Sequence, residues 1–161
     1  MDMLERDQRR LLRLCAALEK IADGLPESLS HTKTAGTLSF LNKAFGRHIF
    51  LHEKYLFPLM RSLAAGNASI EPALKQLEYE HSCDHGIVLE IISAFENGTG
   101  GGESVNAHML GFLLRSFFEN CRRHHSWEEN VLYPVARQHL TGASVAAHRD
   151  TLLRVSLGLK D

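Results

Sequence analysis

An internal repeat constrains the fold of this chain more than any other feature of its sequence. Segments 47–61 and 123–137 lie seventy-six residues apart and have related sequences, RHIFLHEKYLFPLMR and RHHSWEENVLYPVAR. At almost the same offset, the segment Asp7 to Leu12 matches Asp84 to Leu89. The repeat therefore predicts two related helical hairpins packed about a pseudo-two-fold axis, which would bring the middle of all four helices to one central point.

The apolar residues recur at helical spacing, and no segment alternates in the manner of a strand. We predict an all-α fold, an antiparallel up-down-up-down four-helix bundle with a short C-terminal helix. The whole chain, 1–161, forms a single domain, with the bundle at about 2–138 and an extension at about 141–161. The four helices are expected at about 2–23, 31–64, 68–97 and 104–138, with glycine-containing breaks between them.

Composition excludes several classes of protein. With 161 residues, 44% of them hydrophobic, the chain can bury a core without a structural metal, so any metal is expected to be functional. A net charge of −1 disfavours nucleic acid and membrane as partners. The three cysteines have no regular spacing, which indicates a reducing compartment. The first residues of the sequence lack the pattern of a leader peptide, so we expect a cytoplasmic protein. A monomer or a homodimer is expected.

Ten histidines are unusual for this length, and seven of them lie between His48 and His125. Residues four apart share one face of a helix, so paired donors can point at one position inside a bundle. Burying several imidazoles and a carboxylate without a shared cation would leave unsatisfied polar groups. We therefore predict a metal site. Its candidate ligands are His48, His52, His81, His85, His124 and Glu128.

The phrases Leu56-Phe57-Pro58-Leu59, Glu80-His81 and Arg122-Arg123-His124 resemble the bacterial branch of the hemerythrin-like, or HHE cation-binding, domains. The resemblance covers about residues 4–140. It implies a four-helix bundle that holds a pair of non-haem irons, with ligands at His48, His81, His85, His124 and Glu128.

Two positions depart from the family pattern. Gln8 stands where the first-helix histidine belongs, and His52 stands where a bridging carboxylate belongs, with Glu53 displaced by one residue. The loss of that carboxylate leaves two ions and one ion as open alternatives. Gln8, Glu53, Glu129 and His125 are secondary ligand candidates. Imidazole and carboxylate donors suit iron, manganese or zinc, and the resemblance favours iron.

Three functions remain open at this point. The first is reversible binding of dioxygen or another small diatomic by a reduced iron centre, in storage, oxygen or redox sensing, or metal handling. The second is a non-haem iron enzyme acting on peroxide or nitric oxide, for which no catalytic residues can be named. The third is a metal-free or zinc-filled interaction bundle.

Overall fold

The computed structural model describes residues 2–29, 31–63, 70–99 and 105–139, and within these ranges it contains helices and no strand. The second and fourth helical segments are each interrupted by a short π-helical stretch, labelled η. The elements are α1 Asp2–Asp23, α2 His31–Leu51, η1 His52–Leu56, α3 Phe57–Leu63, α4 Ile70–Thr99, α5 Ala107–Trp127, η2 Glu128–Leu132 and α6 Tyr133–His139.

The predicted all-helical bundle is confirmed. The four expected helices correspond to α1, to α2 through α3, to α4 and to α5 through α6, with ends that differ by no more than a few residues. The α5 start is set locally, because the side chain of Asn106 accepts a hydrogen bond of 3.0 Å from the backbone N–H of Met109. The C-terminal helix expected within 141–161 lies outside the described residues.

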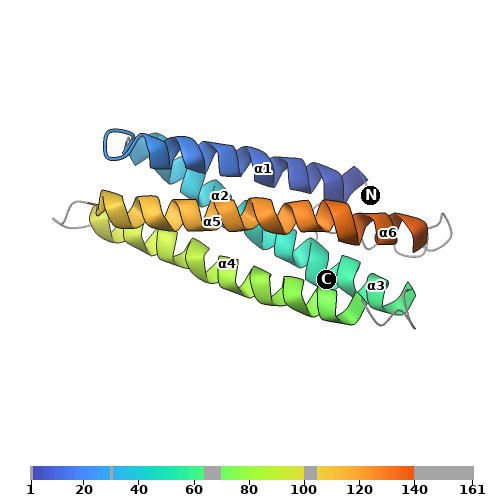
Figure 1. Cartoon of the computed structure of the whole chain (residues 1–161). Helices are drawn as coiled ribbons and strands as arrows, with labels where there is room; N and C mark the ends of the chain where they lie inside the picture. Colours follow the sequence, from blue (N-terminus) through green and yellow to red (C-terminus); the bar gives the residue numbers. More distant parts are fainter. Residues whose placement is uncertain (1, 30, 64–69, 100–104, 140–161) are drawn as a thin grey trace.

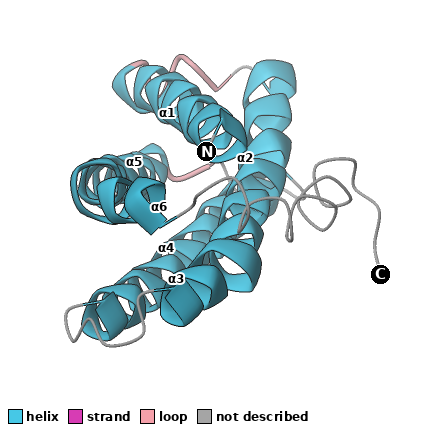
Figure 2. Cartoon of the chain, turned by 90° about the vertical axis from the view of Figure 1, so that its right-hand side faces the viewer, coloured by secondary structure: helices cyan, strands magenta, loops and turns pink. Residues whose placement is uncertain are grey.

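Each long helical segment packs against two others around a shared interior (Figures 1 and 2). α1 lies against α2 and α5, and α4 lies against α2 and α5. Ion pairs join α1 to the last helical segment at both ends, where Arg115 meets Asp23 at 2.8 Å and Arg137 meets Glu5 at 2.9 Å. No described helix is long and apolar enough to cross a bilayer.

The interior consists of two apolar clusters with a polar layer between them. One cluster includes Leu18, Phe45, Val88 and Phe117. The other occupies the opposite end of the bundle and includes Leu51, Phe57, Leu77, Leu132 and Tyr133. Along each contributing helix, the histidines and the glutamate of the predicted site lie between residues of the two clusters. The polar layer is therefore shielded from solvent at both ends.

Candidate metal centre

The second helical segment supplies two of the buried imidazoles. His48 and His52 are four residues apart, so they project from the same helix face, and their ring centroids are 4.1 Å apart. Each residue is only 1% exposed. The prediction that this pair points into the bundle is therefore confirmed.

A π-helical turn begins at His52, and a second one begins at Glu128, the equivalent position of the repeat. The residue that follows each turn donates its backbone N–H to the carbonyl five positions earlier. Phe57 donates to His52 in this way, and Tyr133 donates to Glu128. The next residue is a proline in both copies of the repeat, Pro58 after Phe57 and Pro134 after Tyr133. Because proline lacks an N–H and its ring displaces the carbonyl four residues before it, a widened turn accommodates it without breaking the helix. Such turns often occur at functional sites.

The other donors come from α4 and from the α5–η2 segment. The carboxylate of Glu128 is the common partner: its Oε1 lies 2.6 Å from Nδ1 of His52, 3.1 Å from Nε2 of His124 and 3.8 Å from Nε2 of His48. The rings of His81 and His124 have centroids 4.8 Å apart. Three of the four long helical segments thus contribute to one cluster.

All five of these residues offer ligand atoms within 4.8 Å of one another, and all five are buried. Several of the inward atoms have no hydrogen-bond partner in the described part of the chain. Each buried, unsatisfied polar atom costs about 1 to 3 kcal/mol, so the cluster is unfavourable without a further partner at its centre. The inward atoms without a hydrogen-bond partner are His48 Nε2, His81 Nε2 and Glu128 Oε2, whereas Nδ1 of His52 contacts Oε1 of Glu128.

Carboxylates hold the outer ring nitrogens of two ligands. Nδ1 of His81 lies 3.0 Å from Glu53, and Nδ1 of His124 lies 2.9 Å from Glu80. A carboxylate only accepts, so Nδ1 of His81 carries the proton and its Nε2 presents a lone pair to the cluster when the ring is neutral. His124 has a carboxylate at both nitrogens, because its Nε2 lies 3.1 Å from Oε1 of Glu128. Carboxylate partners of this kind are typical of metal-bound histidines, because they fix the tautomer and the ring orientation.

The remaining two histidines also have outer partners. Nδ1 of His48 lies 3.4 Å from a carboxylate oxygen of Asp7, whose other oxygen is 3.3 Å from Nε of Arg47. Nε2 of His52 lies 3.3 Å from the hydroxyl of Tyr133. Every imidazole in the cluster therefore has one nitrogen next to a polar side chain of the surrounding protein and one nitrogen directed inward.

The ionisation of the cluster follows from its burial and its single carboxylate. Burial, with repulsion from His52, lowers the pKa of His48 to about 4. Burial opposes protonation of His124 too, but hydrogen bonds and charge from Glu128 and Glu80 raise its pKa above the usual value. Burial would raise the pKa of Glu128, yet His52 and His48 hold it well below its usual range. Neutral imidazoles and an ionised carboxylate are the forms that bind metals.

The prediction that His85 points into the bundle is wrong. His85 is exposed, and its neighbour Asp84 is buried instead, 3% exposed and within 3.3 Å of Nδ2 of Asn120. The buried positions of α4 run 70, 74, 77, 81, 84, 88, 91 and 95, alternating steps of four and three. A step of four from 81 to 85 leaves that stripe, so His85 does not join the cluster.

The secondary candidates lie around the cluster and not within it. Glu53 contacts Nδ1 of His81 on the side away from the cluster. His125 is buried, with Nδ1 3.6 Å from Oε2 of Glu128, and Glu129 is exposed. Gln8 is buried, and its Nε2 has no hydrogen-bond partner among the residues that the structure describes.

Sequence reasoning assigned no role to Asp7, Asp84 or Glu80, although each is a buried or half-buried carboxylate next to the centre. A signal for two of them was present. The repeat pairs Asp7 with Asp84, and an acidic residue on an otherwise apolar face at equivalent points of both hairpins indicates a polar neighbour in each. No sequence signal identified Glu80 as the partner of His124, because that contact joins two helices.

The donor set fits a cation. Ligands on opposite sides of an ion with bonds of about 2.0 to 2.2 Å are separated by about 4.0 to 4.4 Å. The largest separation in this cluster, 4.8 Å, exceeds that span only slightly. An ion at the centre would satisfy the unpartnered nitrogens that the protein leaves there. These residues form a buried cluster of imidazoles and one carboxylate that fits a metal cation.

The fold and this site define a metal-binding helical bundle. The model of the hemerythrin HHE cation-binding domain matches residues 1–119, and the chain belongs to that family. The match ends before His124 and Glu128, so their place in the site rests on the structure. No curated protein and no solved structure matches the chain.

Proposed function

We propose that this protein binds one redox-active iron ion in the cluster of His48, His52, His81, His124 and Glu128 and uses it to bind dioxygen or another small diatomic. The observation that carries the proposal is the set of buried, inward ligand atoms without hydrogen-bond partners among the described residues, on His48, His81 and Glu128. Reduced iron would supply affinity for the diatomic. The protein supplies five donors, so a six-coordinate ion would keep one position for that ligand.

Charge and geometry favour one ion over two. The cluster holds a single carboxylate, because His52 occupies the position equivalent to Glu128. One negative charge does little to screen two divalent cations a few ångströms apart. The close approach of all five donor atoms also suits a single centre. Manganese and zinc share this ligand preference, and iron is proposed from family membership.

We also propose how the helices run, where the protein resides and in which oligomeric state it acts. Ion pairs near both ends of α1 and of the α5–α6 segment support helices that run in alternating directions. Cys15, Cys83 and Cys121 are free thiols, which suits a reducing cytoplasm. We take the chain as a single domain, acting as a monomer or a homodimer without nucleic acid or membrane as partner.

Elemental analysis of the protein, purified without a metal-binding tag, tests the metal assignment. We expect about one iron per chain and an absorption spectrum that changes reversibly between oxygen-free and oxygenated solution. Two ions per chain would contradict the single-ion geometry. A protein that contains no iron, or that holds iron without any spectral response to dioxygen, nitric oxide or carbon monoxide, would contradict the proposed function.

A non-haem iron enzyme acting on peroxide or nitric oxide is the second candidate. One observation favours it: the buried hydroxyl of Tyr133 lies 3.3 Å from the ring of His52, where a proton donor would be close to the centre. Consumption of peroxide or nitric oxide by the iron-loaded protein separates the candidates. Turnover that falls in Tyr133→Phe, with iron content unchanged, would favour the enzyme. Reversible binding without turnover would favour the carrier or sensor.

A further inference from the structure

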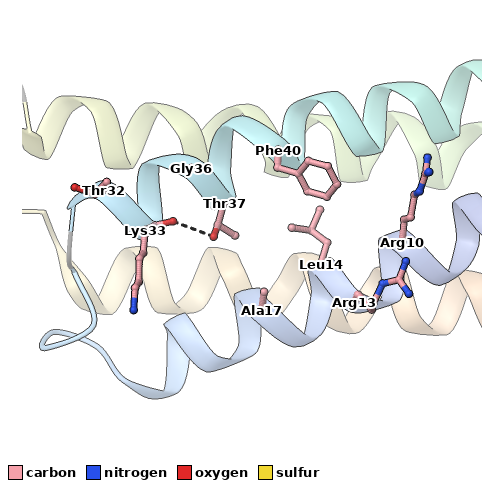
Figure 3. Close-up of a pocket in the computed structure, with 9 residues that line it drawn as sticks. All are labelled: Arg10, Arg13, Leu14, Ala17, Thr32, Lys33, Gly36, Thr37 and Phe40. Atoms are coloured by element: carbon pink, nitrogen blue, oxygen red, sulfur yellow. Dashed lines mark hydrogen bonds between the residues drawn. The ribbon is translucent and has the colours of Figure 1, made fainter. Parts of the chain in front are cut away.

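A hollow on the outside of the bundle lies between α1 and α2, away from the metal donors. It has a volume of about 700 Å³, within the range of small-molecule sites. Its apolar part includes Leu14, Ala17 and Phe40, and Figure 3 shows Leu14 and Phe40 directed toward each other across the two helices. Its basic part consists of Arg10, Arg13 and Lys33.

The hollow continues along α2. A smaller cavity of about 200 Å³ shares Arg10 and Phe40 with it and adds Lys43, Arg47 and Asp7, whose carboxylate pairs with Arg47 at 3.3 Å. From Lys33 to Arg47 an α-helix rises by roughly 21 Å at 1.5 Å per residue. The two cavities thus form one groove, apolar along its floor and bordered by cationic side chains over several helical turns.

Unlike Arg47, the cations of the larger hollow lack, within the described part of the chain, the carboxylate partner that several arginines of the bundle have. Arg122 and Arg137, for example, pair with glutamates of α1 at 2.6 and 2.9 Å. Among the residues that the structure describes, Arg10, Arg13 and Lys33 have no carboxylate partner, and no carboxylate lines the larger hollow. Several unpaired cations along one cleft produce a positive potential that attracts anions.

The floor of the groove is open as well as apolar. Phe40 is 50% exposed, and a Cβ placed on Gly36 would meet no atom within 4 Å. An exposed aromatic ring beside open, apolar surface gains from a hydrocarbon partner, at about 25 cal/mol for each Å² that is removed from water. The groove therefore offers two complementary features at once, an apolar floor and a cationic border.

We propose that the groove between α1 and α2 binds an anionic amphiphile, a molecule of the fatty-acid class with an aliphatic chain and a carboxylate head. The chain would lie over Leu14, Ala17 and Phe40, and the head would meet the unpaired cations. This site is separate from the proposed metal centre and does not depend on it.

Dodecanoate and dodecyltrimethylammonium, used below their micelle concentrations, test the proposal because they share a chain and differ in the sign of the head group. Isothermal titration calorimetry should show saturable binding of dodecanoate to one site, with the cationic probe bound at least about tenfold more weakly. Equal affinities would overturn the proposal, as would absence of saturable dodecanoate binding. If an acidic amphipathic peptide binds to the protein and dodecanoate does not, the partner is a protein segment, and the proposal of an anionic amphiphile is overturned.

Filling the groove gives a second test. Gly36→Leu should weaken dodecanoate binding at least about tenfold, because its side chain would occupy the open floor. Gly86→Leu on α4 is the matched control, since a Cβ there also meets no atom within 4 Å, and both changes remove a helical glycine. Equal effects of the two substitutions would contradict the assignment to this groove.

A charge variant keeps the proposal testable if Gly36→Leu fails to fold. Replacing Arg13 and Lys33 together by glutamine should weaken dodecanoate binding by about fivefold or more, from the loss of two partly exposed ion pairs. Lys20→Gln, an exposed cation of α1 outside the groove, should leave it unchanged. Circular dichroism and iron content confirm that each variant is folded. Unchanged binding in the double variant would overturn the proposed role of these cations.

Discussion

The two hairpins of this bundle have similar backbone structures, but the side chains that they contribute to the central cluster differ in charge. Each places a π-helical turn at the same point of the repeat, His52–Leu56 in one and Glu128–Leu132 in the other. The first residues of these turns meet at the centre, where Nδ1 of His52 is 2.6 Å from the carboxylate of Glu128. The repeat thus supplies a nearly symmetric frame, and two differences within it, His52 opposite Glu128 and Leu4 opposite His81, make the donor set asymmetric.

The asymmetry extends to the equivalent histidines. The pKa of His48 falls to about 4 through burial and the nearby His52, whereas carboxylates raise that of His124 against the effect of burial. Distances explain the difference: His124 lies 2.9 Å from Glu80 and 3.1 Å from Glu128, while the nearest carboxylate to His48 is 3.4 Å away. The same residue type at the same point of a repeat therefore differs in basicity because its neighbours differ.

The strongest test of the comparison removes the carboxylate that only the second hairpin has. Glu128→Gln keeps the shape of the side chain and loses its charge, so we expect metal affinity to fall by more than about a hundredfold, or about 3 kcal/mol. Competition with a metal chelator measures the change. Glu129→Gln, the exposed neighbour, should have no effect, and a similar loss in both variants would contradict the role of Glu128.

Restoring symmetry tests the number of ions. His52→Glu combined with Gln8→His gives the first hairpin the carboxylate and histidine that the family pattern has there, and a second negative charge would screen a second cation. We expect the iron content to rise from about one to about two ions per chain by elemental analysis. His85→Glu, an exposed substitution on α4, is the control. If the double variant binds no more metal than the wild type, position 52 is not where the missing carboxylate belongs.

Outer carboxylates of the two hairpins allow a smaller and more direct comparison. Glu80→Gln acts on His124, and Asp7→Asn acts on His48. Loss of such a partner typically costs about 10- to 100-fold in metal affinity. Because the contact is shorter for Glu80, we expect its substitution to have the larger effect in the same chelator assay. Glu90→Gln, exposed on α4, should be neutral. The reverse order for the two variants would show that distance does not decide their contribution.

The pH dependence of metal binding reports the difference between the histidines. His124, with its raised pKa, should protonate first as the pH falls through the usual histidine range near 6.5, and protonated imidazole cannot bind a metal. Metal content at fixed total iron should therefore decrease between pH 7 and pH 5. In the metal-free protein, NMR titration should show His124 protonating at higher pH than His48. Metal content that does not change over this range would count against ligation by this cluster.

The last comparison concerns the stability of the fold and the buried aspartates of the two hairpins. Asp84 has a neutral partner, Asn120, whereas Asp7 faces Arg47, and burial raises the pKa of Asp84 to about 6. The folded state therefore holds this proton more tightly than the unfolded chain, and ionisation above pH 6 opposes folding.

Asp84→Asn should consequently raise the free energy of unfolding by about 1 to 3 kcal/mol at pH 7.5. The gain should shrink as the pH falls from 6 toward 4, where the wild-type carboxyl becomes protonated in both states. Urea denaturation at several pH values measures this difference. Asp23→Asn, on an exposed side chain paired with Arg115, is the control. A gain that is independent of pH would exclude ionisation of Asp84 as its cause.

The sequence by itself determined the all-helical bundle, the approximate ends of its helices and most of the buried cluster of histidines and glutamate. The spacing of His48 and His52, and of His124 and Glu128, placed each pair on one helix face, because residues four apart always lie close together on an α-helix. The repeat indicated that these pairs meet at one centre, and the structure brings them together. Local geometry of this kind depends only on the chain itself.

Only the tertiary structure decided what lies next to those pairs. Residues 84 and 85 are both compatible with helical spacing from His81, and packing of α4 against α5, where Asp84 meets Asn120, places Asp84 inside and His85 outside. The outer partners, such as Glu80 for His124, likewise come from a neighbouring helix. The rotation and height of one helix against another are set by many weak contacts far apart in sequence, and no local pattern records them.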